Sequence, residues 1–163
     1  MTIKTEKLNK DDKNQVSEEM LQFVTFLVAE ENYGVSVHKV QSINEMLEIT
    51  YVPHSSSYME GVINLRGSVV PVINMRKKFG IPVKEYDLFT VILIVEVKER
   101  LIGMIVDSVS DVVSIPASSI QKDIQFSTKV NVDSIEGIGK LEDELIIILN
   151  VDHFLDDAKE LET

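Results

Sequence analysis

The sequence predicts an all-β protein built from two small β-barrels that follow one another along the chain. Two observations lead to this prediction. Short apolar runs rich in Val, Ile and Phe alternate with polar turns along most of the 163 residues, which is typical of strands. The same order of strands and turns also occurs twice, in residues 20–84 and in residues 85–155. We therefore expect one barrel in each of these segments, with a flexible tail at 1–19 and an acidic tail at 156–163.

The first two strands are expected in the runs QFVTFLV (22–28) and YGVSVHKV (33–40), which the polar turn AEEN separates. In the second run Val35 and Val37 alternate with the polar Ser36. This period of two indicates a strand with one face buried and the other exposed.

Two aligned blocks define the repeat. Placing Gly34 on Gly103, an offset of 69 residues, aligns the first strands with residues 90–109. Placing Gly61 on Gly137, an offset of 76, aligns GVINLRGSVVPVIN with GIGKLEDELIIILN without a gap. We interpret this as an internal duplication, and closing each copy into a barrel removes the strand edges that an open sheet exposes. Short helices are expected as plugs and connectors at residues 55–59, 76–79 and 152–161.

Composition indicates an ordinary globular protein. The hydrophobic fraction is 44% and the mean hydropathy is +0.07. No apolar run reaches the roughly 18 residues of a membrane span, and the first residues carry no apolar segment of the kind found in signal peptides. There is no cysteine, so disulfides and thiolate chemistry are excluded. These features predict a cytoplasmic protein.

Charge is unevenly distributed along the chain, whose formal net charge is −11. Residues 20–84 contain six Lys/Arg against five Asp/Glu, whereas residues 85–163 contain six against seventeen. Such an acidic chain does not favour phosphate contacts, so a nucleic-acid-binding tandem barrel is a weak alternative. The asymmetry indicates either two halves with different neighbours or a contribution to solubility.

The residues offer no catalytic or metal-binding constellation. His38, His54 and His153 lie in different expected elements, and none has a second His or Cys at the spacing of metal ligands. No serine is framed as a nucleophile, and the seven glycines do not form a phosphate-binding loop. We therefore expect no enzyme activity, no metal and no cofactor, and interpret the protein as an interaction module.

Arg66 is the unusual residue of the first hairpin, because it stands at the tip of two apolar strands. Its guanidinium can pair with a partner's carboxylate, or it can be an exposed turn residue beside a local glutamate; both interpretations stay open here. Alternation places Arg66 and Asn64 on one face of the hairpin and Ile63 and Leu65 on the other, in the core. The segment INEMLEI (43–49) is either core or an adhesive patch.

The hairpin and its neighbours form a specific set of motifs. GVINLRG (61–67) is followed by PVINM (71–75), preceded by YGVSVHKVQ (33–41), and followed later by IGMIVDSVSDV (102–112). Together these motifs strongly resemble the CheW family of bacterial chemotaxis coupling proteins, over about residues 21–155.

The resemblance implies a pair of five-stranded, SH3-like β-barrels with a groove between them and no catalysis. Members of the family connect the cytoplasmic tip of methyl-accepting chemotaxis receptors to the regulatory domain of the histidine kinase CheA. The resemblance thus implies a cytoplasmic location in receptor arrays at the inner membrane, without insertion into it. A paralogous coupling protein of another receptor–kinase pathway stays an alternative.

The resemblance also implies two sets of contact residues. The receptor-facing groove would use Val40, Gly61, Asn64, Arg66 and Gly67 on one wall and Gly103, Val109, Val112 and Gly137 on the other. The kinase contact would use Ile43, Met46 and Leu47, and the opposite end of the second barrel would make the other contact of an array ring.

Two positions depart from the family pattern. Many relatives carry a glutamate two residues after the Val40 position, where it can pair with the arginine, but this chain has Ser42 there. Glu45 is the nearest substitute for that glutamate. Asn74 replaces the usual aspartate after the hairpin, so a charge is lost while a hydrogen-bond acceptor is kept.

Overall fold

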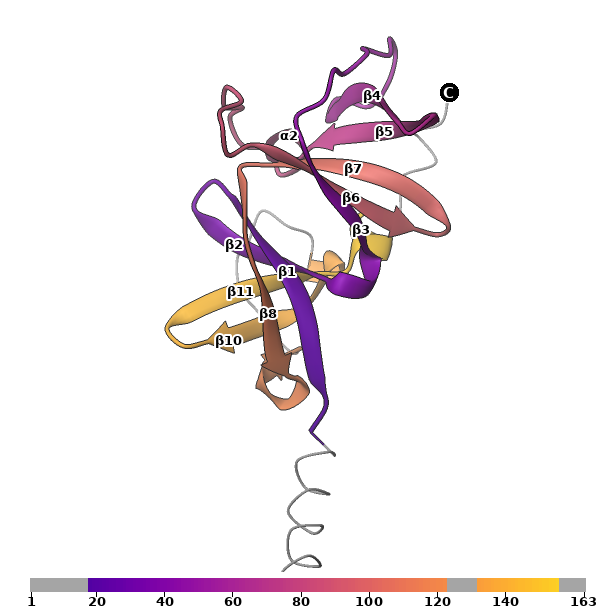
Figure 1. Ribbon diagram of the computed structural model, residues 1–163. Coiled ribbons are helices and arrows are strands. Elements are labelled where there is room, and N and C mark those ends of the chain that lie inside the picture. The colour runs from indigo at the N-terminus through magenta and orange to yellow at the C-terminus, as the bar shows by residue number, and fades with distance from the viewer. Residues whose placement is uncertain (1–17, 123–131, 156–163) are drawn as a thin grey trace, which may run out of the picture.

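The computed structural model describes residues 18–122 and 132–155 and confirms the all-β class. Two bent sheets lie one above the other (Figure 1). The lower sheet contains, in spatial order, β8 (Ser108–Pro116), β1 (Met20–Val28), β2 (Glu31–Ser36), β11 (Glu144–Leu149), β10 (Ile135–Leu141) and β9 (Ile120–Gln121). The upper sheet contains β3 (Val40–Glu45), β6 (Val91–Val97), β7 (Arg100–Val106), β5 (Ser68–Asn74) and β4 (Met59–Leu65).

The two sheets do not correspond to consecutive halves of the chain. Strands of the upper sheet come from residues 40–106, and those of the lower sheet come from residues 20–36 and 108–149. The division expected at 20–84 and 85–155 is therefore wrong for the strand pairing. Each copy gives its first two strands to one sheet and its later strands to the other, and Figure 1 shows β3 rising from the lower body into the upper one.

The short connections explain this exchange. In the lower sheet β1 lies between β2 and β8. If the first copy closed on itself, β3 would take the place of β8 and run parallel to β2 on the far side of β1. A crossover between parallel strands needs about a dozen residues. The short 3-10 helix η1 (Val37–Lys39) provides three, so β3 continues into the upper sheet.

Strand registers confirm the internal duplication. In the lower sheet β11 runs parallel to β2, with Ile148 opposite Gly34. In the upper sheet β5 runs parallel to β7, with Val72 opposite Gly103. These two pairs are related by the offsets of 69 and 76 residues found in the sequence.

Helices are short and lie at the ends of the hairpins. α2 (Met75–Lys78) follows β5 and α3 (Val151–Phe154) follows β11. Asn74 caps the first, since its Oδ1 accepts a hydrogen bond from Arg76 N at 2.9 Å, and Asn150 caps the second by accepting from His153 N at 3.2 Å. Two further 3-10 turns are η2 (Ala117–Ser119) and η3 (Val132–Ser134).

Some expected segments differ from the structure. The helix expected at 55–59 is wrong, because the Ser55 hydroxyl donates to the Val52 carbonyl at 2.9 Å and the backbone forms turns. The expected extension of α3 to residue 161, the tail at 156–163 and nearly all of the tail at 1–19 lie outside the described residues. Within the described residues, no helix is long and apolar enough to cross a bilayer.

Three apolar clusters form the core. The largest takes residues from both sheets and includes a chain of ring contacts from Phe26 through Tyr33 and Phe79 to Phe154, with centroids 5.0–5.8 Å apart. A smaller cluster fills the upper sheet around Ile92, and another fills the lower sheet. The central cluster therefore fixes the two sheets against each other.

Candidate partner-binding site

The hairpin β4–β5 ends in a two-residue turn that exposes Arg66. Leu65 pairs with Ser68, and the intervening Arg66 and Gly67 have φ angles of 53° and 89°. Positive φ at both central residues defines a type I′ turn, whose twist matches that of the strands. Glycine adopts this conformation freely, whereas the left-handed region costs a residue with a Cβ roughly 1–2 kcal/mol.

Asn64 braces this turn. Its Oδ1 accepts a hydrogen bond from Gly67 N at 2.8 Å. In the second copy Lys140 occupies the position of Asn64 and Glu142 that of Arg66. An ammonium group has no acceptor, so Lys140 cannot provide the same brace. The braced turn and the arginine thus belong to the same copy.

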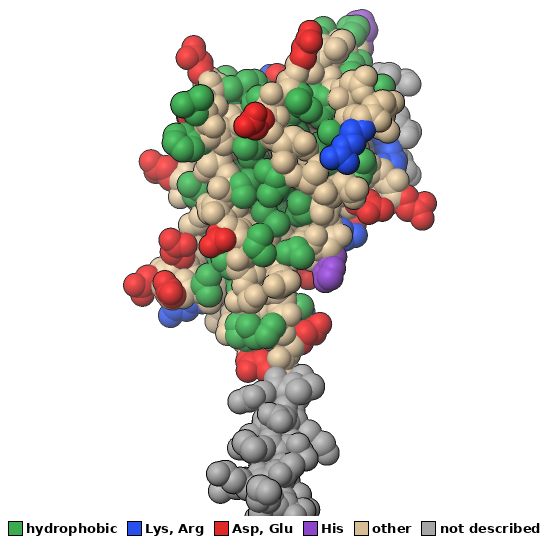
Figure 2. Space-filling view, viewed as in Figure 1, with side chains coloured by type: hydrophobic (Ala, Val, Ile, Leu, Met, Phe, Trp, Pro, Cys, Tyr) green, Lys and Arg blue, Asp and Glu red, His purple; other side chains and the backbone are tan. Residues whose placement is uncertain are grey.

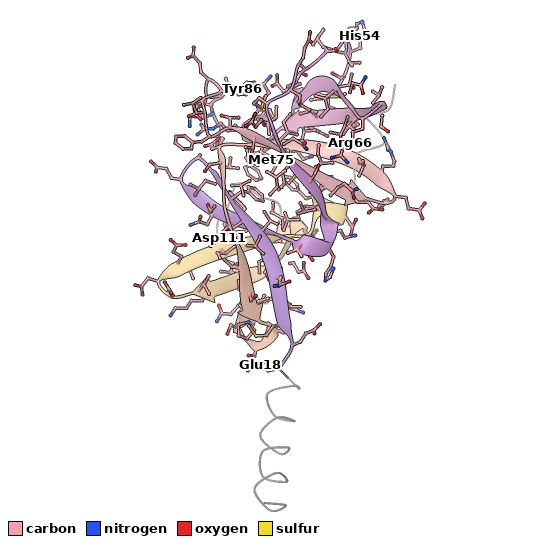
Figure 3. The ribbon with its side chains drawn as sticks, in the orientation of Figure 1. Glu18, His54, Arg66, Met75, Tyr86 and Asp111 are labelled. Atoms are coloured by element: carbon pink, nitrogen blue, oxygen red, sulfur yellow. The ribbon has the colours of Figure 1, made fainter. Side chains whose placement is uncertain are left out.

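The guanidinium of Arg66 is free within the described residues. The side chain is exposed and forms no hydrogen bond or ion pair with any described residue, Glu45 included. Ser42, which replaces the family's glutamate, accepts a hydrogen bond from Asn44 Nδ2 at 2.8 Å instead. Figure 3 shows Arg66 on the upper sheet, away from the described carboxylates that it labels. The local pairing considered from the sequence is therefore not formed with any described residue, which leaves the guanidinium donors available to a partner in this part of the chain.

An exposed valine extends this face of the hairpin. Val69 lies directly opposite Asn64 across the two strands and is 72% exposed. Val69 was not among the contact residues predicted from the sequence, although alternation along β5 places it on the same face as Arg66. The hairpin therefore presents an arginine, an amide and an apolar side chain together.

Valines at the junction of the sheets lie at equivalent positions. Val40 on β3 and Val109 on β8 are half-buried and pack against the central cluster. Val112, also on β8, is 53% exposed. Figure 2 shows hydrophobic side chains gathered where the two sheets meet, with acidic side chains at the rim. Val40 and Val109 thus lie at an apolar junction between the sheets, whereas Val112 is an exposed side chain farther along β8.

Three glycines assigned to the groove are buried at close backbone contacts. Gly61, Gly103 and Gly137 are buried. A Cβ on Gly61 would lie 2.1 Å from the Thr50 carbonyl oxygen, and one on Gly137 would lie 2.6 Å from Ile120 Cγ2. A Cβ on Gly103 would meet side chains of the upper cluster at 2.9 Å. These glycines permit close backbone contacts and offer no side-chain surface to a partner.

The kinase-facing candidates divide between surface and core. Ile43 on β3 is 46% exposed and Leu47 is 39% exposed. Met46, in contrast, is half-buried against the cluster of the upper sheet. Its equivalent in the second copy, Ile115, is fully buried. The segment 43–49 is therefore partly core and partly exposed, and Tyr51, 72% exposed, lies just beyond it.

Most of the chain matches the model of a known protein family. The model of the CheW-like domain matches residues 22–159, most of the chain. The chain belongs to the CheW-like family. The resemblance stated from the motifs is thereby confirmed.

Relatives in this family are similar over most of their length. The chemotaxis protein CheW of Bacillus subtilis is 37% identical over 133 residues, covering 82% of this chain and 85% of the relative. The CheW of Klebsiella aerogenes is 32% identical over 134 residues, covering 82% and 81%. The crystal structure of the scaffolding protein TtCheW from Thermoanaerobacter tengcongensis matches with a TM-score of 0.79 at 34% identity, covering 85% of this chain and 94% of that one. These matches support the tandem SH3-like fold.

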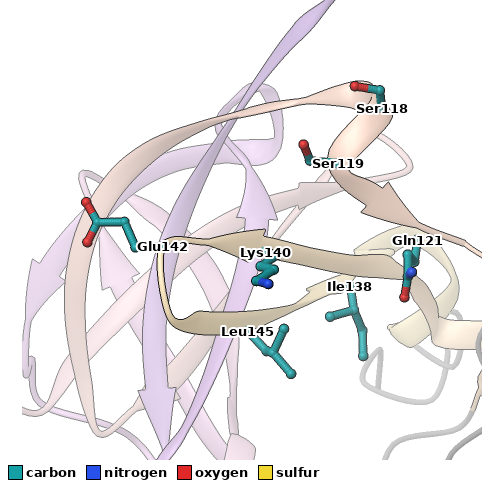
Figure 4. A pocket seen from close by; sticks show the side chains of 7 residues that line it. All are labelled: Ser118, Ser119, Gln121, Ile138, Lys140, Glu142 and Leu145. Atoms are coloured by element: carbon teal, nitrogen blue, oxygen red, sulfur yellow. The ribbon is translucent and has the colours of Figure 1, made fainter.

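A concave surface also lies on the second hairpin of this CheW-like protein. A cavity of about 460 Å³ lies beside β9 and the β10–β11 hairpin (Figure 4). Its lining includes Ile138, Lys140, Glu142 and Leu145, which are the equivalents of Val62, Asn64, Arg66 and Val69. The two hairpins thus present equivalent faces with opposite charge at the tip. Among the described residues, no cluster of three or more His, Asp or Glu side chains is arranged to hold a metal.

Proposed function

We propose that this protein is a non-catalytic adaptor that couples transmembrane chemotaxis receptors to the histidine kinase CheA. Family membership supports the adaptor role, since the relatives are chemotaxis proteins and a similar structure is that of a scaffolding protein. The single observation that carries the proposal is the exposed Arg66, held in a braced turn on one copy alone and left without a partner in the described residues.

The proposed receptor face consists of the Arg66 turn and the valines assigned to the groove. Arg66 would pair bidentately with a carboxylate of the receptor tip, and Val40, Val109 and Val112 would supply apolar contact. Gly67 would let the receptor approach the turn closely. The three buried glycines are not part of this proposed surface.

The proposed kinase face uses Ile43 and Leu47 on the exposed side of β3 and the segment after it. Exposed apolar residues beside a folded core are typical of protein interfaces. The mechanism is positional: the protein holds the kinase against the receptor, and a coupling free energy of about 1–3 kcal/mol is enough to transmit a change of state. The site of action would be receptor arrays beneath the inner membrane.

Binary binding measurements test the two faces separately. Receptor tips displayed on vesicles and the isolated kinase regulatory domain should each bind the protein. Competition between the two partners for one surface would contradict the proposed arrangement.

A further inference from the structure

Asn64 differs from the other proposed contact residues because its side-chain oxygen is already used within the protein. The oxygen accepts from the N–H of Gly67, which directly follows Arg66 in the turn. The Asn64 side chain is exposed, so this hydrogen bond is not needed to satisfy a buried group. Its effect is on the conformation of the turn.

Arginine disfavours a φ of 53°, and the hydrogen bond from Gly67 N to Asn64 stabilises the turn that holds Arg66 there. Glu142 adopts a φ of 56° at the equivalent turn of the second copy, where Lys140 has no acceptor, so the brace strengthens this conformation and is not required for it. If the turn relaxed to negative φ, the Cα–Cβ bond of Arg66 would point in another direction. The same device occurs at the β1–β2 turn, where Ala29 has a φ of 49° and donates its N–H to Asp107 Oδ2 at 2.9 Å. At two separate places a side-chain acceptor thus binds a backbone N–H of a tight turn that contains a non-glycine residue at positive φ.

We infer that Asn64 is a positioning residue: it fixes the direction of Arg66 toward the receptor and does not itself contact the receptor. This inference rests on the proposed function, and it changes the role that the family resemblance gave Asn64. In the second copy both residues are replaced, Asn64 by Lys140 and Arg66 by Glu142, which is consistent with a brace that serves the arginine.

A double-mutant cycle on receptor affinity tests the inference. Asn64→Ala should weaken binding to receptor tips about fivefold, the effect of losing one exposed hydrogen bond. In an Arg66→Ala background, which should itself bind at least about tenfold more weakly, Asn64→Ala should change affinity by less than about twofold. Asn64→Asp keeps the acceptor and should retain most of the affinity. Lys140→Ala, at the equivalent position of the second copy, is the matched control and should change nothing.

A structural readout separates positioning from general destabilisation. Amide hydrogen exchange at Gly67 should be faster in Asn64→Ala, while Tm stays within about 4 °C of the parent protein. Equal losses from Asn64→Ala in both backgrounds would show that Asn64 touches the receptor and would overturn the inference. An unchanged receptor affinity of Asn64→Ala would also overturn the inference. An unchanged receptor affinity of Arg66→Ala would contradict the proposed receptor face and, with it, the inference about Asn64. This outcome therefore differs from those that overturn the inference alone.

Discussion

The guanidinium of Arg76 donates two hydrogen bonds to the carboxylate of Asp107, Nε to Oδ1 at 2.9 Å and Nη2 to Oδ2 at 2.7 Å. This pair lies just beyond the ends of the parallel strands β5 and β7. At the equivalent ends of β11 and β2, Lys39 pairs with Asp152 at 2.8 Å. Arg76 lies on the helix that follows β5, whereas Lys39 lies on the connection that follows β2. The ion pairs at these equivalent strand ends therefore have their positive and negative partners exchanged.

Replacing Asp107 with Asn should destabilise the fold by about 1–3 kcal/mol, since the hydrogen bonds from Arg76 and Ala29 N lose their charged acceptor and one of its two oxygens in a mostly buried pair. Urea unfolding at pH 7 measures this loss. Asp152→Asn is the matched control, and its exposed pair should contribute no more than about 1 kcal/mol. Equal losses of stability from the two substitutions would contradict the larger contribution assigned to the Asp107 pair.

The contribution of Asp107 should depend on pH. Burial raises the pKa of this carboxyl, but hydrogen bonds from Arg76 and Ala29 N outweigh burial and hold the pKa below its ordinary value. The stabilisation is therefore fully present above the unfolded pKa of about 4 and is lost as pH falls through the folded pKa. The difference in unfolding free energy between the parent protein and Asp107→Asn should shrink on acidification below about pH 4. A difference that stays constant to pH 2 would oppose this explanation.

Reversing the charge of Arg66 should abolish receptor binding and leave stability nearly unchanged. Arg66→Glu removes an exposed side chain that has no partner among the described residues, so Tm should shift by less than about 2 °C. Co-sedimentation with receptor-containing membranes measures the binding. Glu142→Arg, at the equivalent turn of the second copy, should leave receptor binding intact. A large fall in the Tm of Arg66→Glu would instead make the arginine structural.

Charged substitutions in the segment 43–49 should have two different outcomes. Ile43→Asp and Leu47→Asp should weaken capture of the kinase regulatory domain at least about tenfold and spare the receptor, because both side chains are exposed. Met46→Asp should lower stability by several kcal/mol, because a carboxylate would enter the cluster of the upper sheet. Far-ultraviolet circular dichroism during heating separates the two classes. Unfolding of Ile43→Asp would place that residue in the core.

Gly61→Ala should destabilise the protein by more than about 2 kcal/mol, because the added Cβ would clash with the Thr50 carbonyl oxygen. Gly80→Ala is the control: its φ is 72° but no atom lies within 4 Å, so about 1 kcal/mol is expected. Denaturant titration measures both. If Gly61→Ala kept full stability while losing receptor affinity, the glycine would belong to the binding face after all.

The repeat was predicted correctly from the sequence, and the structure shows that Gly34 and Gly103, which the alignment placed together, lie opposite equivalent partners. It did not lead us to the exchange of strands between the sheets. Similar apolar alternation in both copies is compatible both with copies that close on themselves and with copies that exchange strands. The deciding feature is the three-residue connection at Val37–Lys39, which is too short for a crossover.

Part of the candidate site was also predictable. A turn at Arg66 and the exposure of its side chain follow from the hairpin pattern and are confirmed. The brace from Asn64 could not be foreseen, since it depends on the backbone conformation of the turn. The buried position of Gly103 was missed because a glycine in a motif can serve packing or recognition, and only the neighbouring side chains distinguish the two.

A sedimentation assay with three components tests the central claim most directly. Receptor-containing membranes, the kinase regulatory domain and this protein are combined, and the sedimented kinase is quantified. Kinase should sediment with the membranes when the parent protein is present, and fall to background without it or with either Arg66→Glu or Ile43→Asp. Kinase that sediments equally well without the protein, or with both variants, would contradict the adaptor function.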